Sequence, residues 1–213
     1  REFDYSRSGN PTRKNAEKTI ANLETGFGAL GFSSGMAAVH CATMLLSAGD
    51  HLVAGADIYG GTYRLLHKIC DRAGINVTLV ENPTPSRLRD AITSQTRMIW
   101  LESPGNPLMS ITDLKACCDE FTQEENVLVA VDNTFATPVL TRPIELGADI
   151  VMHSATKYLG GHSDALGGFL VTKTQELFKE LYFVQNATGA VMSPMDSFLI
   201  SRGMKTLDLR VRA

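Results

Sequence analysis

Lys157 and Asp132 are the residues of this 213-residue chain whose types and positions most directly suggest chemistry. Lys157 follows the apolar, strand-like stretch 148–152 and two hydroxyl side chains, and it precedes a pair of glycines. A lysine at the end of a strand is well placed to form an imine with a carbonyl group. Asp132 ends a second apolar run at 127–131, so its carboxylate is expected at the same edge of a sheet.

Together these two residues suggest a site for pyridoxal phosphate (PLP). In such a site a lysine holds the cofactor as an imine, and a carboxylate faces the pyridinium nitrogen. Each residue alone has an ordinary alternative, because Asp132 could cap a helix or a turn and Lys157 could lie on the surface. Thr134 lies two residues after Asp132 and is placed in the same predicted site.

Two further stretches could bind the phosphate group. The sequence at 33–36 predicts a strand that turns into a helix at Gly35 and Met36, where free backbone N–H groups and the helix dipole favour an anion. Ser154 and Thr156 would point to the same side of an extended segment, so both hydroxyls could bind one phosphate. The alternatives are a capped helix and ordinary surface hydroxyls.

Four other residues complete the predicted site. Tyr59 precedes Gly60 and Gly61 and could stack on the cofactor ring and later exchange protons, or simply pack over the sheet edge. Asn106 lies in a loop flanked by prolines, from which it could donate to the cofactor's phenolic oxygen. Tyr5 and Arg7, ahead of the first helix, could contact a phosphate, including that of a neighbouring subunit, or form an exposed leader.

The composition favours a globular protein. The formal net charge of −3 offers no basic field for nucleic acid, and no apolar stretch reaches transmembrane length. The four cysteines lack the spacings of a zinc site or a redox CxxC motif, which predicts no metal site and reduced thiols in a cytoplasmic protein.

Strands are expected at 29–32, 51–54, 76–80, 98–101, 127–131, 150–152 and 168–171. Helices are expected at 12–24, with Thr12 as its cap, and at 62–73, 86–92, 112–121, 175–186 and 195–201, with another beginning near 35. This alternation predicts a mostly parallel sheet with helices on both faces.

With these residues assembled, the sequence closely resembles the Cys/Met-metabolism PLP-dependent enzymes, the group of cystathionine γ-lyase, β-lyase and γ-synthase. The matching stretches run in order over most of the chain: YSRSGNPT (5–12), SSGMAA (33–38), DIYGGT (57–62), ESPGNP (102–107), VDNTF (131–135) and SATKYLGGHSD (154–164). The resemblance implies the large domain of a type I aminotransferase-like fold at 26–213. It also implies that 1–25, an N-terminal arm and first helix, contact a neighbouring subunit in a homo-oligomer, commonly a dimer of dimers.

The same resemblance assigns roles to the site residues. Lys157 would carry PLP, Asp132 would face the pyridinium, Tyr59 would stack on the ring, and Asn106 would bind the phenolate. Members of the group are about twice as long, so a C-terminal small domain is expected to be absent from this chain. The expected function is elimination on a sulfur amino acid, most simply by a cystathionine lyase. The alternatives are cystathionine γ-synthase or a related γ-replacement transferase, methionine γ-lyase, and a truncated non-catalytic PLP-binding homologue.

Overall fold

The computed structural model describes residues 3–122, 124 and 126–213. Within them, seven strands form one sheet in the order β1-β7-β6-β5-β4-β2-β3. The strands are β1 (Gly28–Phe32), β2 (His51–Gly55), β3 (Asn76–Val80), β4 (Thr96–Glu102), β5 (Leu128–Asp132), β6 (Ile150–Ser154) and β7 (Gly168–Thr172). Strands β2 to β6 pair in parallel, whereas β7 is antiparallel to both β1 and β6. The predicted mostly parallel sheet is therefore confirmed.

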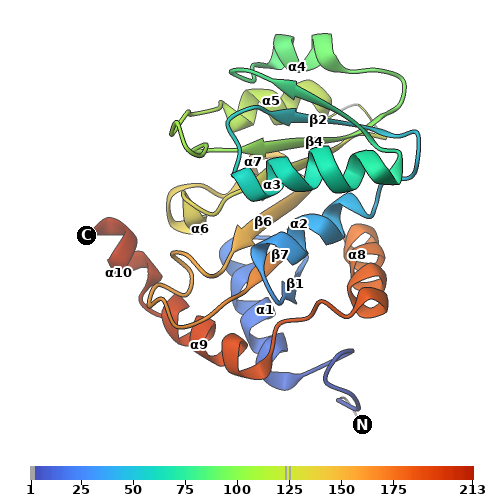
Figure 1. Ribbon diagram of the computed structural model, residues 1–213. Helices are drawn as coiled ribbons and strands as arrows, with labels where there is room; N and C mark the ends of the chain where they lie inside the picture. Colours follow the sequence, from blue (N-terminus) through green and yellow to red (C-terminus); the bar gives the residue numbers. More distant parts are fainter. Residues whose placement is uncertain (1–2, 123, 125) are drawn as a thin grey trace.

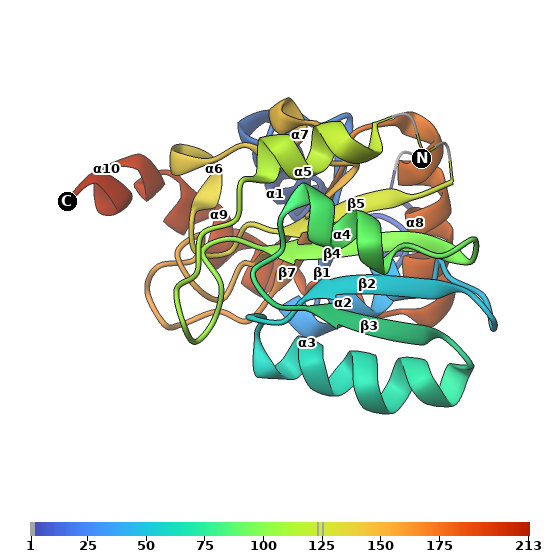
Figure 2. The same ribbon diagram turned by 90° about the horizontal axis from the view of Figure 1, so that it is seen from above.

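Helices cover both faces of the sheet (Figures 1 and 2). They are α1 (Pro11–Leu23), α2 (Gly35–Thr43), α3 (Gly60–Leu65), α4 (Pro85–Ala91), α5 (Leu114–Phe121), α6 (Thr137–Leu140), α7 (Pro143–Leu146), α8 (Gln175–Thr188), α9 (Pro194–Met204) and α10 (Leu207–Arg212). In Figure 2, α3 lies on one side of the strands and α5 on the other.

Alternating side chains on each strand form two apolar layers. On β4, Met98 and Trp100 pack in the layer that contains α2, α3 and α8. Ile99 and Leu101 point the other way and pack with α4 and α5. All four side chains are fully buried, and each contributes ~1.5–3 kcal/mol relative to an exposed side chain. This two-sided burial explains why the strands read as continuous apolar runs.

The cap of the first helix and the form of the helix expected at 62–73 differ from the prediction. Asn10, and not Thr12, caps α1, because its Oδ1 accepts the backbone N–H groups of Thr12 and Arg13 and Pro11 can begin a helix. The helix expected at 62–73 begins at Gly60 as α3 and continues as a π-helical turn (Leu66–Cys70) and a 3₁₀ turn (Asp71–Ala73).

The first helix packs on its own chain. Ala16 and Ile20 of α1 are fully buried with β7, α9 and α10. The assignment of 1–25 to a neighbouring subunit stays a prediction, and residues 1 and 2 of that segment lie outside the described residues. No helix in the described part of the chain is long and apolar enough to cross a membrane.

Candidate active site

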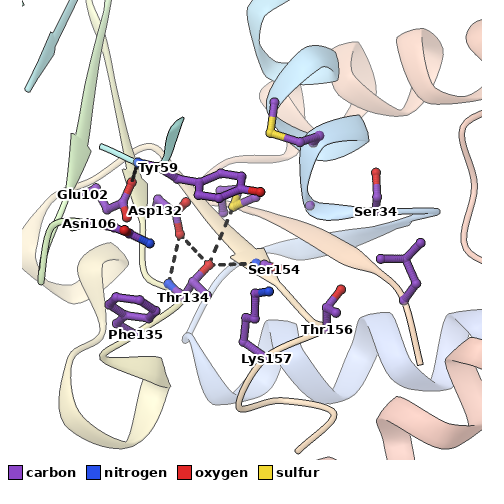
Figure 3. Close-up of a pocket in the computed structure, with 14 residues that line it drawn as sticks. Ser34, Tyr59, Glu102, Asn106, Asp132, Thr134, Phe135, Ser154, Thr156 and Lys157 are labelled. Atoms are coloured by element: carbon purple, nitrogen blue, oxygen red, sulfur yellow. Dashed lines mark hydrogen bonds between the residues drawn. The ribbon is translucent and has the colours of Figure 1, made fainter. Parts of the chain in front are cut away.

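A cavity of about 420 Å³ lies where β4, β5 and β6 end and α2 begins (Figure 3). Its volume falls within the range of pockets that bind small molecules. Its lining residues are Ser34, Gly35, Met36, Tyr59, Glu102, Asn106, Asp132, Thr134, Phe135, Met152, Ser154, Thr156, Lys157 and Leu166. All the predicted site residues except Tyr5 and Arg7 are among them.

Tyr5 and Arg7 do not line this cavity. Arg7 donates hydrogen bonds to the backbone carbonyl and, at 3.0 Å, to the side-chain oxygen of Asn186. Its guanidinium also lies over the ring of Tyr5, whose side chain is exposed. A contact between these two residues and a phosphate of a neighbouring subunit stays a prediction.

Lys157 lies in the turn that follows β6. Its backbone N–H donates to the carbonyl of Ser154 at 3.2 Å, which closes the turn directly after the strand. Figure 3 shows the side chain beside Ser154 with its amine directed into the cavity. The end of β6 therefore presents the amine where a bound carbonyl compound could reach it.

Asp132 is fixed by Thr134. The Thr134 hydroxyl donates to Asp132 Oδ1 at 2.5 Å, and the Thr134 backbone N–H donates to the same oxygen at 3.0 Å. The hydroxyl of Thr134 also accepts the backbone N–H of Ser154 at 2.8 Å. Thr134 therefore joins the ends of β5 and β6, the strands that carry the carboxylate and the lysine.

The cavity contains two buried carboxyl groups, those of Glu102 and Asp132, whose ionised forms a bound cation would stabilise. Glu102 and Asp132 occupy paired positions on β4 and β5, and both are buried. Burial, and then the charge of Asp132, raise the pKa of Glu102 to about 8. Burial also raises the pKa of Asp132, while the hydrogen bonds from Thr134 and the charge of His153 act in the opposite direction. A cationic ligand group would favour the ionised carboxylate.

Glu102 is a site residue that the sequence reasoning did not single out. Its Oε2 accepts the backbone N–H of Tyr59 at 2.8 Å, which holds the segment that carries the aromatic ring. Glu102 ends the apolar run of β4 just as Asp132 ends that of β5, and this shared pattern could have identified it. Phe135, Met152 and Leu166 also line the cavity and were missed, because apolar residues give no distinctive sequence signal.

The loop that carries Asn106 is held by Asp57. The two carboxylate oxygens of Asp57 accept the backbone N–H groups of Leu108 and Ser110, and the Ser110 hydroxyl donates to it at 2.6 Å. The peptide bonds before Pro104 and Pro107 are cis. Asp57 lies two residues before Tyr59, so this one carboxylate ties together two loops that line the cavity.

The opposite end of the cavity offers groups suited to an anion. Ser34 caps α2 by accepting the N–H of Ala37 at 3.1 Å. The N–H groups of Gly35 and Met36 are the first two of the helix, so neither has an acceptor within the helix. A methyl group at Gly35 would lie 3.2 Å from Ser154 Oγ, which places the Ser154 hydroxyl close to this helix start.

The expectation that Ser154 and Thr156 share an extended segment is wrong. The strand ends at Ser154, and the chain turns from Ala155 onward. The hydroxyl of Thr156 donates to the carbonyl of Gly167 at 3.2 Å and accepts the N–H of Gly167 at 3.1 Å. Both side chains still line the cavity, and the role of each toward a phosphate stays a prediction.

These residues fit PLP. A helix start and hydroxyls lie at one end, a buried carboxylate lies at the other, and the amine of Lys157 lies in the same cavity. That donor set matches the anionic phosphate, the pyridinium and the aldehyde of the cofactor.

The family model for Cys/Met metabolism PLP-dependent enzymes matches residues 1–213. The chain belongs to this family. Cystathionine γ-lyase of Bacillus subtilis (strain 168) is 50% identical over 211 residues, which cover 99% of this chain and 55% of the relative. Cystathionine β-lyase of Lactococcus lactis subsp. cremoris (strain MG1363) is 49% identical over 213 residues, 100% of this chain and 56% of the relative. Cystathionine γ-synthase/O-acetylhomoserine (thiol)-lyase of B. subtilis (strain 168) is 50% identical over 210 residues, 99% of this chain and 56% of the relative.

The fold of this family member matches a solved structure. Cystathionine γ-lyase from Lactobacillus plantarum, complexed with L-serine, superposes with a TM-score of 0.95 at 46% identity. The match covers 98% of this chain and 55% of the solved chain. The chain thus spans about half the length of the relatives it matches, and those relatives divide among γ-lyases, β-lyases and a γ-synthase at similar identity.

Proposed function

We propose that this chain forms the cofactor-binding part of a PLP-dependent carbon–sulfur lyase that cleaves cystathionine or a similar sulfur amino acid. The observation that carries the proposal is the convergence of Lys157 and Asp132 on one cavity. Two of the three relatives described above are cystathionine lyases, which supports elimination as the reaction.

Lys157 has two tasks in this proposal. When bound, PLP would supply the electron sink that stabilises a carbanion at the substrate's α-carbon. The Lys157 amine would hold the cofactor covalently and, when free in the substrate complex, would accept the α-proton. For γ-cleavage the same amine would have to pass the α-proton on to the bound cofactor before it could accept a proton from the β-carbon.

The other cavity residues orient the reaction. Asp132 holds the proton on the pyridine nitrogen, and its two hydrogen bonds from Thr134 fix that carboxylate. Tyr59 would pack on the ring and exchange a proton with the substrate amine or the leaving group. Asn106 would donate to the phenolic oxygen, while Gly35, Met36, Ser154 and Thr156 would bind the phosphate.

A transferase is the second candidate, since the γ-synthase relative is as similar as the γ-lyase. The test is to incubate the full-length protein with cystathionine and measure 2-oxobutanoate, pyruvate and ammonia. A γ-lyase yields 2-oxobutanoate and a β-lyase yields pyruvate. Formation of cystathionine from an activated homoserine and cysteine, with no cleavage, would overturn the lyase proposal in favour of the synthase. Cleavage of methionine would instead favour a methionine γ-lyase, and a protein that binds PLP but catalyses none of these reactions would favour the non-catalytic PLP-binding homologue.

The assembly and the location are part of the same proposal. A homo-oligomer, a dimer of dimers, would bring Tyr5 and Arg7 to a neighbouring site, and sedimentation of the full-length protein measures its size. A cytoplasmic location is supported by the four cysteines, all of which are free and buried.

A further inference from the structure

A buried polar cluster lies on the face of the sheet opposite the cavity. It consists of Glu24, Asn133 and His153, called here the Glu24 cluster, and each of the three side chains is fully buried. Glu24 follows the last turn of α1, Asn133 follows β5, and His153 lies on β6. None of the three lines the cavity.

One carboxylate oxygen joins the cluster. Glu24 Oε1 lies 2.6 Å from His153 Nε2 and accepts a hydrogen bond from Asn133 Nδ2 at 2.8 Å. The same Asn133 nitrogen donates to the carbonyl of Thr141 at 2.8 Å. The remaining polar atoms, Glu24 Oε2, Asn133 Oδ1 and His153 Nδ1, have no hydrogen-bond partner in the described structure. The contacts at Oε1 are therefore what compensates the buried carboxylate.

The Glu24 cluster lies at the carboxyl ends of β5 and β6, on the face of the sheet opposite the cavity. Asp132 of β5 pairs with Met152 of β6, so the residues that follow them, Asn133 and His153, are neighbours on the opposite face. The backbone N–H of Asn133 donates to the carbonyl of Met152 at 2.9 Å, which continues the pairing. On this face of the sheet Glu24 therefore bridges β5, which ends at Asp132, and β6, which leads into the turn that carries Lys157.

Charge links the two faces of the sheet. A buried carboxylate needs a nearby cation, and the imidazole of His153 is in contact with Glu24. A positive charge on His153 also favours the ionised form of Asp132, one residue away along the neighbouring strand. The cluster thus holds the geometry of the strand ends and contributes to the charge of the carboxylate.

We propose that Glu24, Asn133 and His153 are positioning residues for the PLP site, whose hydrogen bonds at Glu24 Oε1 align the ends of β5 and β6. This inference rests on the proposed function, because it assigns a role toward the cofactor. It extends the site to α1, a helix 109 residues before Asn133 in the sequence.

The first test is the hydrogen bond between His153 and Glu24. Nuclear magnetic resonance of the ring nitrogens in the cofactor-free full-length protein should show a proton on Nε2 that is donated to the Glu24 carboxylate. A His153 Nε2 without this hydrogen bond in the wild-type protein would overturn the inference, and this measurement requires no variant to fold.

The second test is the affinity for PLP, measured by titration into the cofactor-free full-length protein. His153→Gln should raise the dissociation constant severalfold, because the imidazole that joins Glu24 to β6 is lost. Glu24→Gln should weaken binding in the same direction and serves in place of His153→Gln if that variant does not fold.

The matched control is His51→Gln. His51 is another buried imidazole of the sheet, but it lies at the start of β2, where its nitrogens contact Thr96 and Thr78. His51→Gln should lower stability without changing PLP affinity. Equal weakening by the control, or unchanged affinity in both cluster variants, would overturn the inference. The proposed function fails separately, if the wild-type protein itself does not bind PLP through Lys157.

Discussion

The two edges of the sheet use buried polar residues in different ways. At the amino edge, His51 Nδ1 lies 2.8 Å from Thr96 Oγ1, and its Nε2 lies 2.9 Å from Thr78 Oγ1. At the carboxyl edge, Glu102 and Asp132 are also buried but face a cavity, with no cationic side chain among its lining residues other than Lys157. Polar groups that satisfy one another hold strands together, whereas convergent groups that lack a counter-charge are suited to a ligand.

Among substitutions at the carboxyl edge, Lys157→Ala should have the largest effect on PLP attachment and activity. We expect the full-length variant to lose covalent attachment of PLP, with the absorbance band of the bound cofactor, and to lose ~10³-fold or more of its activity, because both the nucleophile and the base are removed. Lys173→Ala is the control, since Lys173 lies near Asp149 at the other edge. A variant at Lys157 that kept the band would contradict the assignment.

Asp132→Asn tests the carboxylate while preserving its shape. We expect the PLP dissociation constant to rise about 10- to 100-fold, because a charge-assisted hydrogen bond is worth ~1.5–3 kcal/mol. The matched control is Asp149→Asn, a carboxylate before β6 whose Oδ2 accepts the N–H of Val129 at 2.9 Å. If both variants weakened PLP binding equally, the two edges would not differ as described.

His51→Leu tests the amino edge. It leaves the hydroxyls of Thr78 and Thr96 without their imidazole partner, so the free energy of unfolding should fall by ~1–3 kcal/mol. Urea denaturation of the cofactor-free full-length protein measures this loss. PLP affinity should stay unchanged, and a loss of affinity would show that the amino edge also shapes the site.

Glu102→Gln tests how the two neighbouring carboxyl groups at the carboxyl edge affect the pH dependence of the unfolding free energy. The pKa of Glu102 is raised from its ordinary 4.5 to about 8, so between these values the folded state keeps a proton that the unfolded chain has released. The stabilising effect is fully present below pH 4.5 and is lost as the pH rises through about 8. Cofactor-free protein should therefore lose stability over this range, by at most ~1.4 kcal/mol per pH unit from this group.

The Glu102→Gln variant should show a flatter dependence of its unfolding free energy on pH. Glu176→Gln, at an exposed position in the first turn of α8, is the control and should leave the slope unchanged. Identical slopes for Glu102→Gln and the wild-type protein would mean that Glu102 is not protonated in the folded state.

Local sequence predicted much of this site but not its support. Asp132 and Lys157 were identifiable because each follows an apolar run, and parallel strands bring such ends to one edge. Glu102 follows the same rule but was not identified. It is followed directly by a turn that contains prolines and a glycine, and such a sequence predicts a loop more strongly than a site carboxylate. The Glu24–His153 contact joins residues 129 positions apart on the opposite face, and no local pattern encodes such a pairing.

The N-terminal segment shows a different limit of sequence reasoning. The prediction of Thr12 as the helix cap was wrong. Proline is favoured at the first position of a helix, so Pro11 indicates that Asn10, the residue before it, is the cap. Arg7 was interpreted as a phosphate ligand, and within this chain its guanidinium contacts Asn186. A role of Arg7 at another subunit would depend on a contact between two chains, and the residues next to Arg7 in the sequence do not identify such a contact.

The most direct measurement is borohydride reduction of the PLP-loaded full-length protein, followed by peptide mass spectrometry. Reduction fixes an imine as a stable pyridoxyl adduct on the lysine that carries the cofactor. We predict that the adduct is found on Lys157. An adduct on any other lysine, or none, would contradict the central claim that the carboxyl edge of this sheet binds PLP through Lys157.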